Sequence, residues 1–101
     1  MELSYRHLID GEDDLLFKEF EWDNGNIEHI LRHGVLLDEV EEACINRSHV
    51  RRTADKRYLI YGITDSGRYL FIVGINKGKG IFRTITARDM TEREKSLHRR
   101  R

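Results

Sequence analysis

The chain has 101 residues, no proline, a formal net charge of zero and a negative mean hydropathy. This length supports one domain with one hydrophobic core, and the 39% of hydrophobic residues exclude a disordered chain. No run approaches the roughly 20 apolar residues of a membrane-spanning helix, and the first residues lack the basic start and apolar core of a signal peptide. We therefore expect a cytoplasmic protein.

The charges are divided unevenly along the chain. The first 46 residues hold 3 Lys or Arg against 13 Asp or Glu, whereas residues 47–101 hold 15 against 5. Such a division is typical of a chain with one basic, anion-binding surface. It also fits two halves that fold against each other and pair their charges, so both interpretations stay open.

The first predicted element follows a segment of 16 residues. Residues 1–16 contain a turn-like acidic cluster at 11–14, and we interpret them as an N-terminal extension that forms an edge strand or a flexible lead. Residues 17–22 alternate with period two and predict a strand. We expect a single domain over residues 17–101.

Two helices are predicted next. Asp23 suits the N-cap and Gly34 the C-terminal cap of a helix over residues 24–33. Its expected core positions are Ile27, Ile30 and Leu31. The second helix has capping-box spacing at residues 38–41. Its expected apolar stripe is Leu36, Leu37, Val40, Ala43 and Cys44.

From residue 47 the hydrophobic period changes from helical to extended. The segments rich in β-branched and aromatic residues are 48–53, 58–64, 69–76 and 81–87, and turn signals separate them. They predict an antiparallel meander. Residues 91–94 form another capping box, which opens a short C-terminal helix with Met90 and Leu97 as its apolar anchors. The whole pattern predicts an α+β fold in which two N-terminal helices pack on a twisted antiparallel sheet.

Several kinds of site are absent from the sequence. It contains no glycine-rich phosphate loop, and its one cysteine, Cys44, excludes an internal disulfide or a paired-cysteine metal site. His29 and His33 lie four residues apart on one predicted helix and are near enough to share a metal, but no third ligand completes the set. We expect neither a cofactor nor a metal, and we interpret Cys44 as a buried structural thiol.

The residues that remain suit the cleavage of RNA without a metal. That reaction needs a proton-transfer group for the ribose 2′-OH or the leaving 5′-oxygen, and histidine ionises near neutral pH. It also needs cations around the phosphate, for which arginine is suited because its planar guanidinium forms paired hydrogen bonds. His33 is the candidate for either of these proton-transfer roles. Its alternative role is to stabilise the last carbonyls of its helix.

Strand alternation narrows the choice of arginines. In the last strand Arg83 shares a face with Ile81 and Ile85, whereas Arg88 falls on the other face with Phe82. Arg88 ends that strand just before the helix, where a long side chain can reach across an open sheet edge.

Two motifs identify a family. The run Trp22-Asp23-Asn24-Gly25-Asn26-Ile27-Glu28-His29-Ile30-Leu31-Arg32-His33-Gly34-Val35, with Phe20-Glu21 before it and Ile85-Thr86-Ala87-Arg88-Asp89-Met90-Thr91 near the other end, resembles the BrnT family of bacterial toxins. The resemblance spans about residues 17–98. It implies a RelE-like fold, an endoribonuclease that inhibits translation, and a ribbon-helix-helix antitoxin as partner. DNA would be contacted only indirectly, through the antitoxin complex.

The resemblance also bears on single residues. Arg88 falls on the family's Ser/Thr-Ala-Arg motif at the RNA-cleaving site, and Arg57, Arg68 and Arg83 fall where the family commonly has arginine. The predicted catalytic residues are His33, Arg83 and Arg88. The predicted RNA-binding residues are Arg32, Arg57, Arg68 and Trp22, the last as a platform for base stacking unless it belongs to the core. The basic end, residues 99–101, is a solvated tail or adds phosphate affinity.

Three functions stay open on this basis. The first is a metal-independent endoribonuclease toxin of a type II toxin-antitoxin module. The second is a noncatalytic RNA-binding or protein-binding module with the same fold. The third is an enzyme of another class, including one that uses a metal at His29 and His33.

Overall fold

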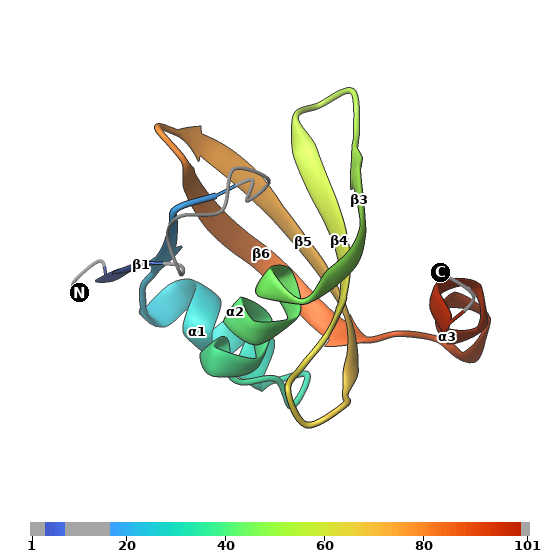
Figure 1. Cartoon of the computed structure of the whole chain (residues 1–101). Coiled ribbons are helices and arrows are strands. Elements are labelled where there is room, and N and C mark those ends of the chain that lie inside the picture. The colour runs from blue at the N-terminus through green and yellow to red at the C-terminus, as the bar shows by residue number, and fades with distance from the viewer. Residues whose placement is uncertain (1–3, 8–16, 100–101) are drawn as a thin grey trace.

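The computed structural model describes residues 4–7 and 17–99, which form one six-stranded sheet and three helices (Figure 1). In chain order the elements are β1 (Ser4–His7), β2 (Glu19–Trp22), α1 (Asn24–Leu31), α2 (Leu37–Ile45), β3 (Arg47–Arg52), β4 (Arg57–Ile63), β5 (Tyr69–Gly78), β6 (Ile81–Asp89) and α3 (Glu92–Arg99). The predicted α+β class is confirmed. The finer RelE-like assignment stays a prediction.

The strands lie in the order β1-β2-β6-β5-β4-β3. β3 to β6 form the predicted antiparallel meander, but β2 pairs with β6 in parallel, so the prediction of an antiparallel sheet is wrong at this pair. The carbonyl of Gly80 accepts hydrogen bonds from the backbone N–H of Lys18 (2.7 Å) and of Glu19 (3.1 Å) at the start of this pair. Hydrophobic periodicity assigns a face to each residue of a strand but specifies neither its neighbour nor its direction.

The N-terminal segment contributes an edge strand. β1 pairs antiparallel with β2, from Ser4 opposite Trp22 to His7 opposite Glu19. This is one of the two alternatives predicted for the segment. The acidic cluster at 11–14 and the last two arginines lie outside the described residues, so the predictions for them stay predictions.

The predicted caps of α1 form in the structure. Asp23 accepts a hydrogen bond from the backbone N–H of Asn26 (3.1 Å), and the Asn26 side chain accepts one from the N–H of Asp23 (2.9 Å). Gly34 has a φ of +74°, a conformation that glycine adopts without steric cost. The helix ends at Leu31, two residues earlier than predicted, because Arg32 is its C-cap.

Asn26 also joins α1 to the sheet. Its buried side-chain amide donates to the backbone carbonyls of Glu21 (3.0 Å) on β2 and Thr84 (3.1 Å) on β6. These carbonyls lie where the two strands stop pairing, since the β2–β6 register ends with Glu21 opposite Arg83. The amide therefore replaces strand hydrogen bonds at a buried position, where an unpaired carbonyl would be costly.

Thr84 offers a test of the packing around this junction. Its side chain is fully buried, and its hydroxyl has no hydrogen-bond partner among the described residues. Replacing Thr84 by valine removes a buried polar group at nearly constant shape, so we expect the free energy of unfolding to rise by about 1 kcal/mol. For a domain of this size the melting temperature should rise by roughly 4–8 °C in thermal denaturation. A lower melting temperature would mean that the hydroxyl has a partner in solution.

The start of α2 differs from the prediction. Leu36 is the N-cap of α2, and the backbone N–H of Leu36 donates a hydrogen bond to the Glu39 carboxylate (3.0 Å). The reciprocal capping pattern that was predicted to start at Asp38 therefore does not form. Val40, Ala43 and Cys44 are buried as predicted, and burial raises the pKa of the Cys44 thiol. The helix approaches the sheet closely.

Gly62 on β4 explains how closely α2 approaches. A Cβ atom at this glycine would lie 1.9 Å from the carbonyl oxygen of Ala43. Any larger residue would therefore push the helix away from the sheet.

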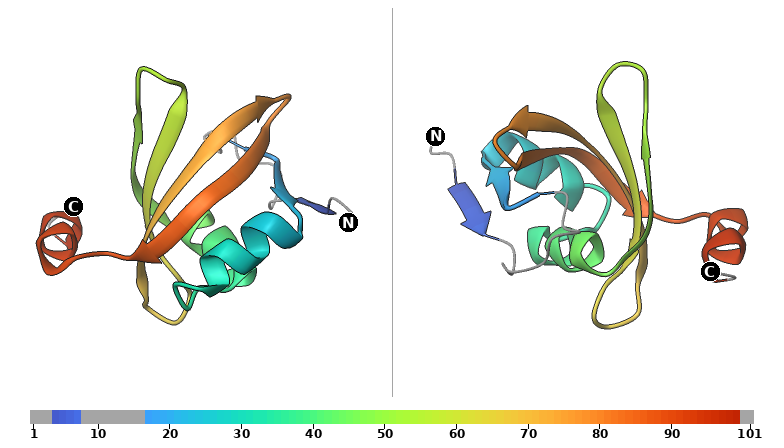
Figure 2. Two further views of the ribbon diagram at one scale, coloured as in Figure 1. Left: turned by 180° about the vertical axis from the view of Figure 1, so that it is seen from behind. Right: turned by 45° about the horizontal axis from the view of Figure 1, so that its top comes forward.

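The hydrophobic core lies between one face of the sheet and helices α1 and α2 (Figure 2). Its largest fully buried side chains are Trp22, Phe20, Phe82, Ile30, Ile60, Leu70 and Ile72. Leu31 and Leu36 were predicted to face this core, but both are more than half exposed because they lie at the ends of their helices. None of the described helices is both long and apolar enough to cross a membrane.

A β-bulge in β6 decides which residues face away from the helices. Gly74 lies opposite Thr84 and Val73 lies opposite Thr86, so one extra residue of β6 stands between these pairs. The bulge reverses the alternation beyond it and brings Arg88 to the same face as Arg83, which corrects the prediction of opposite faces. We call this face, opposite α1 and α2, the open face.

Candidate functional site

One row of side chains crosses four strands on the open face. His49 on β3 lies opposite Tyr61 on β4, Tyr61 opposite Phe71 on β5, and Phe71 opposite Arg88 on β6. The ring centroids of Tyr61 and Phe71 are 5.0 Å apart, and the Arg88 guanidinium carbon lies 4.3 Å from the Phe71 centroid. A cation over aromatic rings is therefore presented on the face that α1 and α2 leave uncovered.

After a short connection, α3 lies on the side of the sheet opposite α1 and α2 (Figure 2). His98 is buried, and its ring stacks on Tyr61 with centroids 4.3 Å apart and planes 21° apart, while the His49 ring lies 5.8 Å away. Of the two predicted apolar anchors of α3, Met90 is buried as predicted, whereas Leu97 is 54% exposed. The helix is held to the row by an aromatic stack instead.

The other contact between α3 and the row is an ion pair. Arg88 Nη1 and Nη2 donate to the two carboxylate oxygens of Glu94, at 2.9 and 3.1 Å. This bond lowers the pKa of Glu94 and raises the pKa of Arg88. The capping box of α3 forms as predicted, because Thr91 and Glu94 exchange side-chain to backbone hydrogen bonds. Glu94 thus occupies the place where an oxyanion would meet the guanidinium.

Glu94 and His98 lie four residues apart on α3, so they share one side of the helix at a spacing of about 6 Å. The pairs Arg88–Glu94 and Tyr61–His98 are therefore neighbours. Together these four side chains form what we call the α3 cluster. It contains one cation, one carboxylate, one imidazole and one phenol.

A second group of histidines lies at the outer edge of β6. Beyond Arg83 this strand no longer pairs with β2, and α1 packs beside it. His29 Nε2 lies 3.1 Å from the Thr86 hydroxyl, two residues before Arg88. The exposed ring of His33 lies 5.4 Å from the His29 ring. His33 is therefore connected to the strand that carries Arg88 only through His29 and Thr86 in the described contacts.

The structure gives Arg83 a different environment from Arg88. Arg83 Nη1 donates to Glu21 (3.1 Å) and to Asp23 (2.8 Å), and Nη2 also donates to Asp23 (3.3 Å). Hydrogen bonding from Arg83 lowers the pKa of Asp23, the N-cap of α1. Two carboxylates already satisfy this guanidinium, so its geometry fits a tie between β6, β2 and α1 better than a phosphate ligand.

Arg68 is engaged in a similar way. It donates to both oxygens of Asp89 (2.7 and 3.2 Å), to Glu39 (3.0 Å) and to the carbonyl of Gly34 (2.8 Å). Its side chain is 27% exposed and that of Arg83 is 25% exposed, against 39% for Arg88. Arg88 is thus the most accessible of the three, and the only one of them with a single carboxylate partner among the described residues.

Of the other residues that were predicted to contact RNA, two lie on the surface and one lies in the core. Arg57 is exposed and pairs with Asp55 (3.3 Å), and Arg32 is exposed at the end of α1. Trp22 is 1% exposed, and its indole N–H donates to Glu41 (2.8 Å), so it cannot stack on a base in this conformation. The prediction of a stacking role for Trp22 is corrected in favour of core packing.

Sequence reasoning missed the histidine and tyrosine of the α3 cluster. Tyr61 has the pattern of a strand residue, and His98 stands in a weakly apolar helix where a buried polar ring has no periodic signal. Their proximity depends on the return of α3 to the sheet. Among the side chains that the structure describes in residues 17–99, no set of three or more His, Cys, Asp or Glu is placed to hold a metal ion.

These features define a small α+β protein that presents an arginine, a histidine and aromatic rings on the uncovered face of its sheet. A family model described as the ribonuclease toxin BrnT of type II toxin-antitoxin systems matches residues 22–94, well over half of the chain. The protein belongs to this family of ribonuclease toxins, which implies RNA as target and an antitoxin as partner. No curated protein and no solved structure matches the chain.

Proposed function

We propose that this protein is a metal-independent endoribonuclease, that it arrests growth by cleaving RNA needed for translation, and that the α3 cluster is its active site. The observation that carries the proposal is the pairing of Arg88 with one carboxylate beside the stacked His98. The cluster combines a phosphate-binding cation with a group that transfers protons near neutral pH. Both groups lie on the face of the sheet that α1 and α2 leave uncovered.

Arg88 binds the scissile phosphate in this proposal. A phosphodiester presents two non-bridging oxygens with a geometry like that of a carboxylate, so it can replace Glu94 on the two guanidinium N–H groups. The ribose 2′-oxygen then attacks phosphorus and the bond to the 5′-oxygen breaks, which leaves a 2′,3′-cyclic phosphate and a 5′-hydroxyl. Arg88 stabilises the charge that gathers on the non-bridging oxygens in the transition state.

His98 transfers a proton in the same reaction. It takes the proton of the attacking 2′-hydroxyl or gives one to the leaving 5′-oxygen, the two roles that a histidine fills near neutral pH. The geometry favours His98 over the predicted His33, because His98 contacts the row that contains Arg88 whereas His33 lies at the strand edge. His98 lies four residues beyond the family match, so its role rests on the contacts in this chain alone.

The partner and the compartment follow from the proposed activity. A toxin that cleaves RNA in the cytoplasm needs an antitoxin, and we propose a ribbon-helix-helix protein, which would carry the complex to DNA. An antitoxin that covers the open face would block Arg88. We keep Arg32, Arg57 and Arg68 as proposed RNA contacts of lower importance, because the last two already pair with carboxylates.

The test is an assay of the purified protein on single-stranded RNA in excess EDTA. We expect specific cleavage products whose yield does not change when magnesium or zinc is added. The noncatalytic alternative predicts RNA binding with a steep dependence on salt and no products. Cleavage that depends on an added divalent ion would instead support an enzyme of another class.

A further inference from the structure

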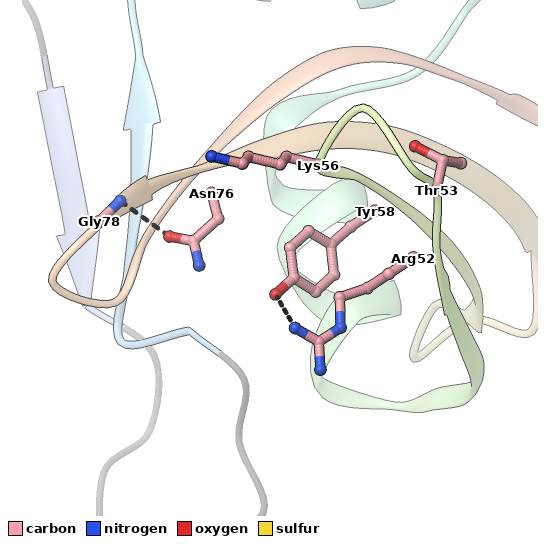
Figure 3. A pocket seen from close by; sticks show the side chains of 6 residues that line it. All are labelled: Arg52, Thr53, Lys56, Tyr58, Asn76 and Gly78. Carbon is pink, nitrogen blue, oxygen red and sulfur yellow. Dashed lines mark hydrogen bonds between the residues drawn. The ribbon is translucent and has the colours of Figure 1, made fainter.

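A hollow of about 550 Å³ lies between the β3–β4 hairpin and the β5–β6 hairpin (Figure 3). The described residues that line it are Arg52, Thr53, Lys56, Tyr58, Asn76 and Gly78. They come from the tips of two hairpins that rise at the same end of the sheet and diverge with its twist (Figure 1). A volume of this size matches that of small-ligand sites.

The lining contains two cations and, among the described residues, no carboxylate. The Arg52 guanidinium lies over the Tyr58 ring at 5.6 Å and Nη1 donates to the Tyr58 hydroxyl at 3.5 Å, but it has no carboxylate partner in the described part of the chain. The same holds for Lys56. These cations differ in this respect from Arg57, Arg68, Arg83 and Arg88, which all pair with carboxylates.

The neutral groups of the hollow are also oriented as donors. The Asn76 side-chain oxygen accepts a hydrogen bond from the backbone N–H of Gly78 (2.8 Å), which leaves its amide N–H groups to face the hollow (Figure 3). The hydroxyl of Tyr58 points into the same space. The hollow thus presents two cations, an amide and a hydroxyl as hydrogen-bond donors. Such a set suits an anion that accepts several hydrogen bonds at once.

We propose that this hollow is a phosphate-binding subsite for single-stranded RNA, distinct from the α3 cluster. The inference rests on the proposed function, since RNA is the polyanion that a ribonuclease must hold. Arg52 and Tyr58 belong to the face opposite the one that carries Arg88, because Arg52 lies opposite Tyr58, which packs in the core. The subsite therefore holds a phosphate away from the scissile one and anchors the strand without taking part in cleavage.

The charge around the hollow supports a polyanion of some length. Exposed Lys79 adds a further cation at the turn between β5 and β6, next to the lining residue Gly78. Each phosphate that such a surface neutralises on a single strand adds about 0.7 to the slope of log affinity against log salt. The number of phosphates held at the hollow is thus a measurable quantity.

The test measures binding of a fully 2′-O-methylated single-stranded RNA by fluorescence anisotropy at several salt concentrations. This probe lacks the attacking hydroxyl, so binding is separated from cleavage. For the double variant Arg52→Gln, Lys56→Gln we expect the salt slope to fall by about 0.7, as for one phosphate, and the affinity at 0.1 M salt to fall roughly fivefold. The matched control is Arg93→Gln, Lys95→Gln on α3, which removes the same charge without touching the hollow.

The outcomes separate the subsite from the catalytic proposal. Equal losses in the two double variants would overturn the subsite, because the effect would then come from net charge alone. Displacement of the RNA by polyglutamate of equal charge, with an equal loss of polyglutamate binding in the variant, would assign the hollow to an acidic protein segment. If the wild type binds the probe with the expected difference between variants but cleaves no RNA, the subsite stands and the ribonuclease proposal fails.

Discussion

Replacing Arg88 by alanine is expected to lower the rate of RNA cleavage by about a hundredfold or more while the protein stays folded. The loss follows because the guanidinium is the proposed donor to the charge that develops on the scissile phosphate, and removing one such donor typically costs a factor of 10² to 10³. The folded state should tolerate the change, since the Arg88 side chain is 39% exposed and its ion pair with Glu94 is partly screened by solvent. The measurement is single-turnover cleavage, with circular dichroism and thermal melting as the check on folding.

Two further variants show whether the loss belongs to the site. Arg88→Lys keeps the charge but not the paired donors, so we expect it to recover only part of the activity. Lys18→Ala removes an exposed cation that precedes β2 and has no proposed contact with RNA, so it should change the rate less than threefold. Equal activity of Arg88→Ala and the wild type would remove Arg88 from the active site.

The second large effect is expected at His98. His98→Gln should slow cleavage by about 10² to 10⁴-fold, the range of a lost proton-transfer group, whereas His33→Gln should leave the rate within a few-fold of the wild type. This pair of variants compares the histidine that contacts the row of Arg88 with the exposed histidine at the strand edge. The readout is the rate of cleavage of a short RNA at saturating substrate.

A purely structural role of His98 would also be visible. His98 packs α3 against Tyr61, so loosening of the helix alone would also lower the rate of the variant, and the pH profile distinguishes the two cases. The wild type should show a limb in its rate against pH that reflects a histidine, and His98→Gln should lose that limb. A variant with a lower rate but an unchanged profile would assign His98 to positioning. A large loss in His33→Gln instead would return the base to α1.

Local sequence signals predicted the elements well where one residue acts on its own neighbours. Asp23 caps α1, Thr91 and Glu94 cap α3, and Gly34 takes its positive φ, because each depends on atoms within one turn. The strands of the meander were predicted to within about two residues at each end for the same reason. The exposure of Leu31 could not be read from spacing, since it depends on where the helix ends.

Long-range features were the ones that the sequence could not specify. The parallel pairing of β2 with β6 depends on the path of the chain through the whole meander. The bulge before Thr86 turns Arg88 to the open face, and although Gly74 lies opposite it on β5, no glycine or proline of β6 itself marks it.

The candidate site was only partly predictable for a related reason. The motif around Arg88 predicted a site on β6, but the partners of the arginines decide which guanidinium can bind a phosphate. Arg83 has two carboxylate partners and Arg88 has one, and no pattern within either strand reveals this difference. The opposing charges of the two halves of the chain supply the partners of Arg83, whereas Arg88 pairs with Glu94 of its own half, and Arg52 and Lys56 are left to face the hollow.

The chemical nature of the RNA ends produced in EDTA tests the central claim most directly. The account predicts products with 2′,3′-cyclic phosphate and 5′-hydroxyl ends, and it predicts that a single 2′-deoxy substitution at the cleaved nucleotide blocks the reaction. These results require the ribose hydroxyl as nucleophile and a proton-transfer group such as His98 beside the phosphate held by Arg88. Products with 5′-phosphate ends, or products that form only when a divalent metal is added, would contradict it.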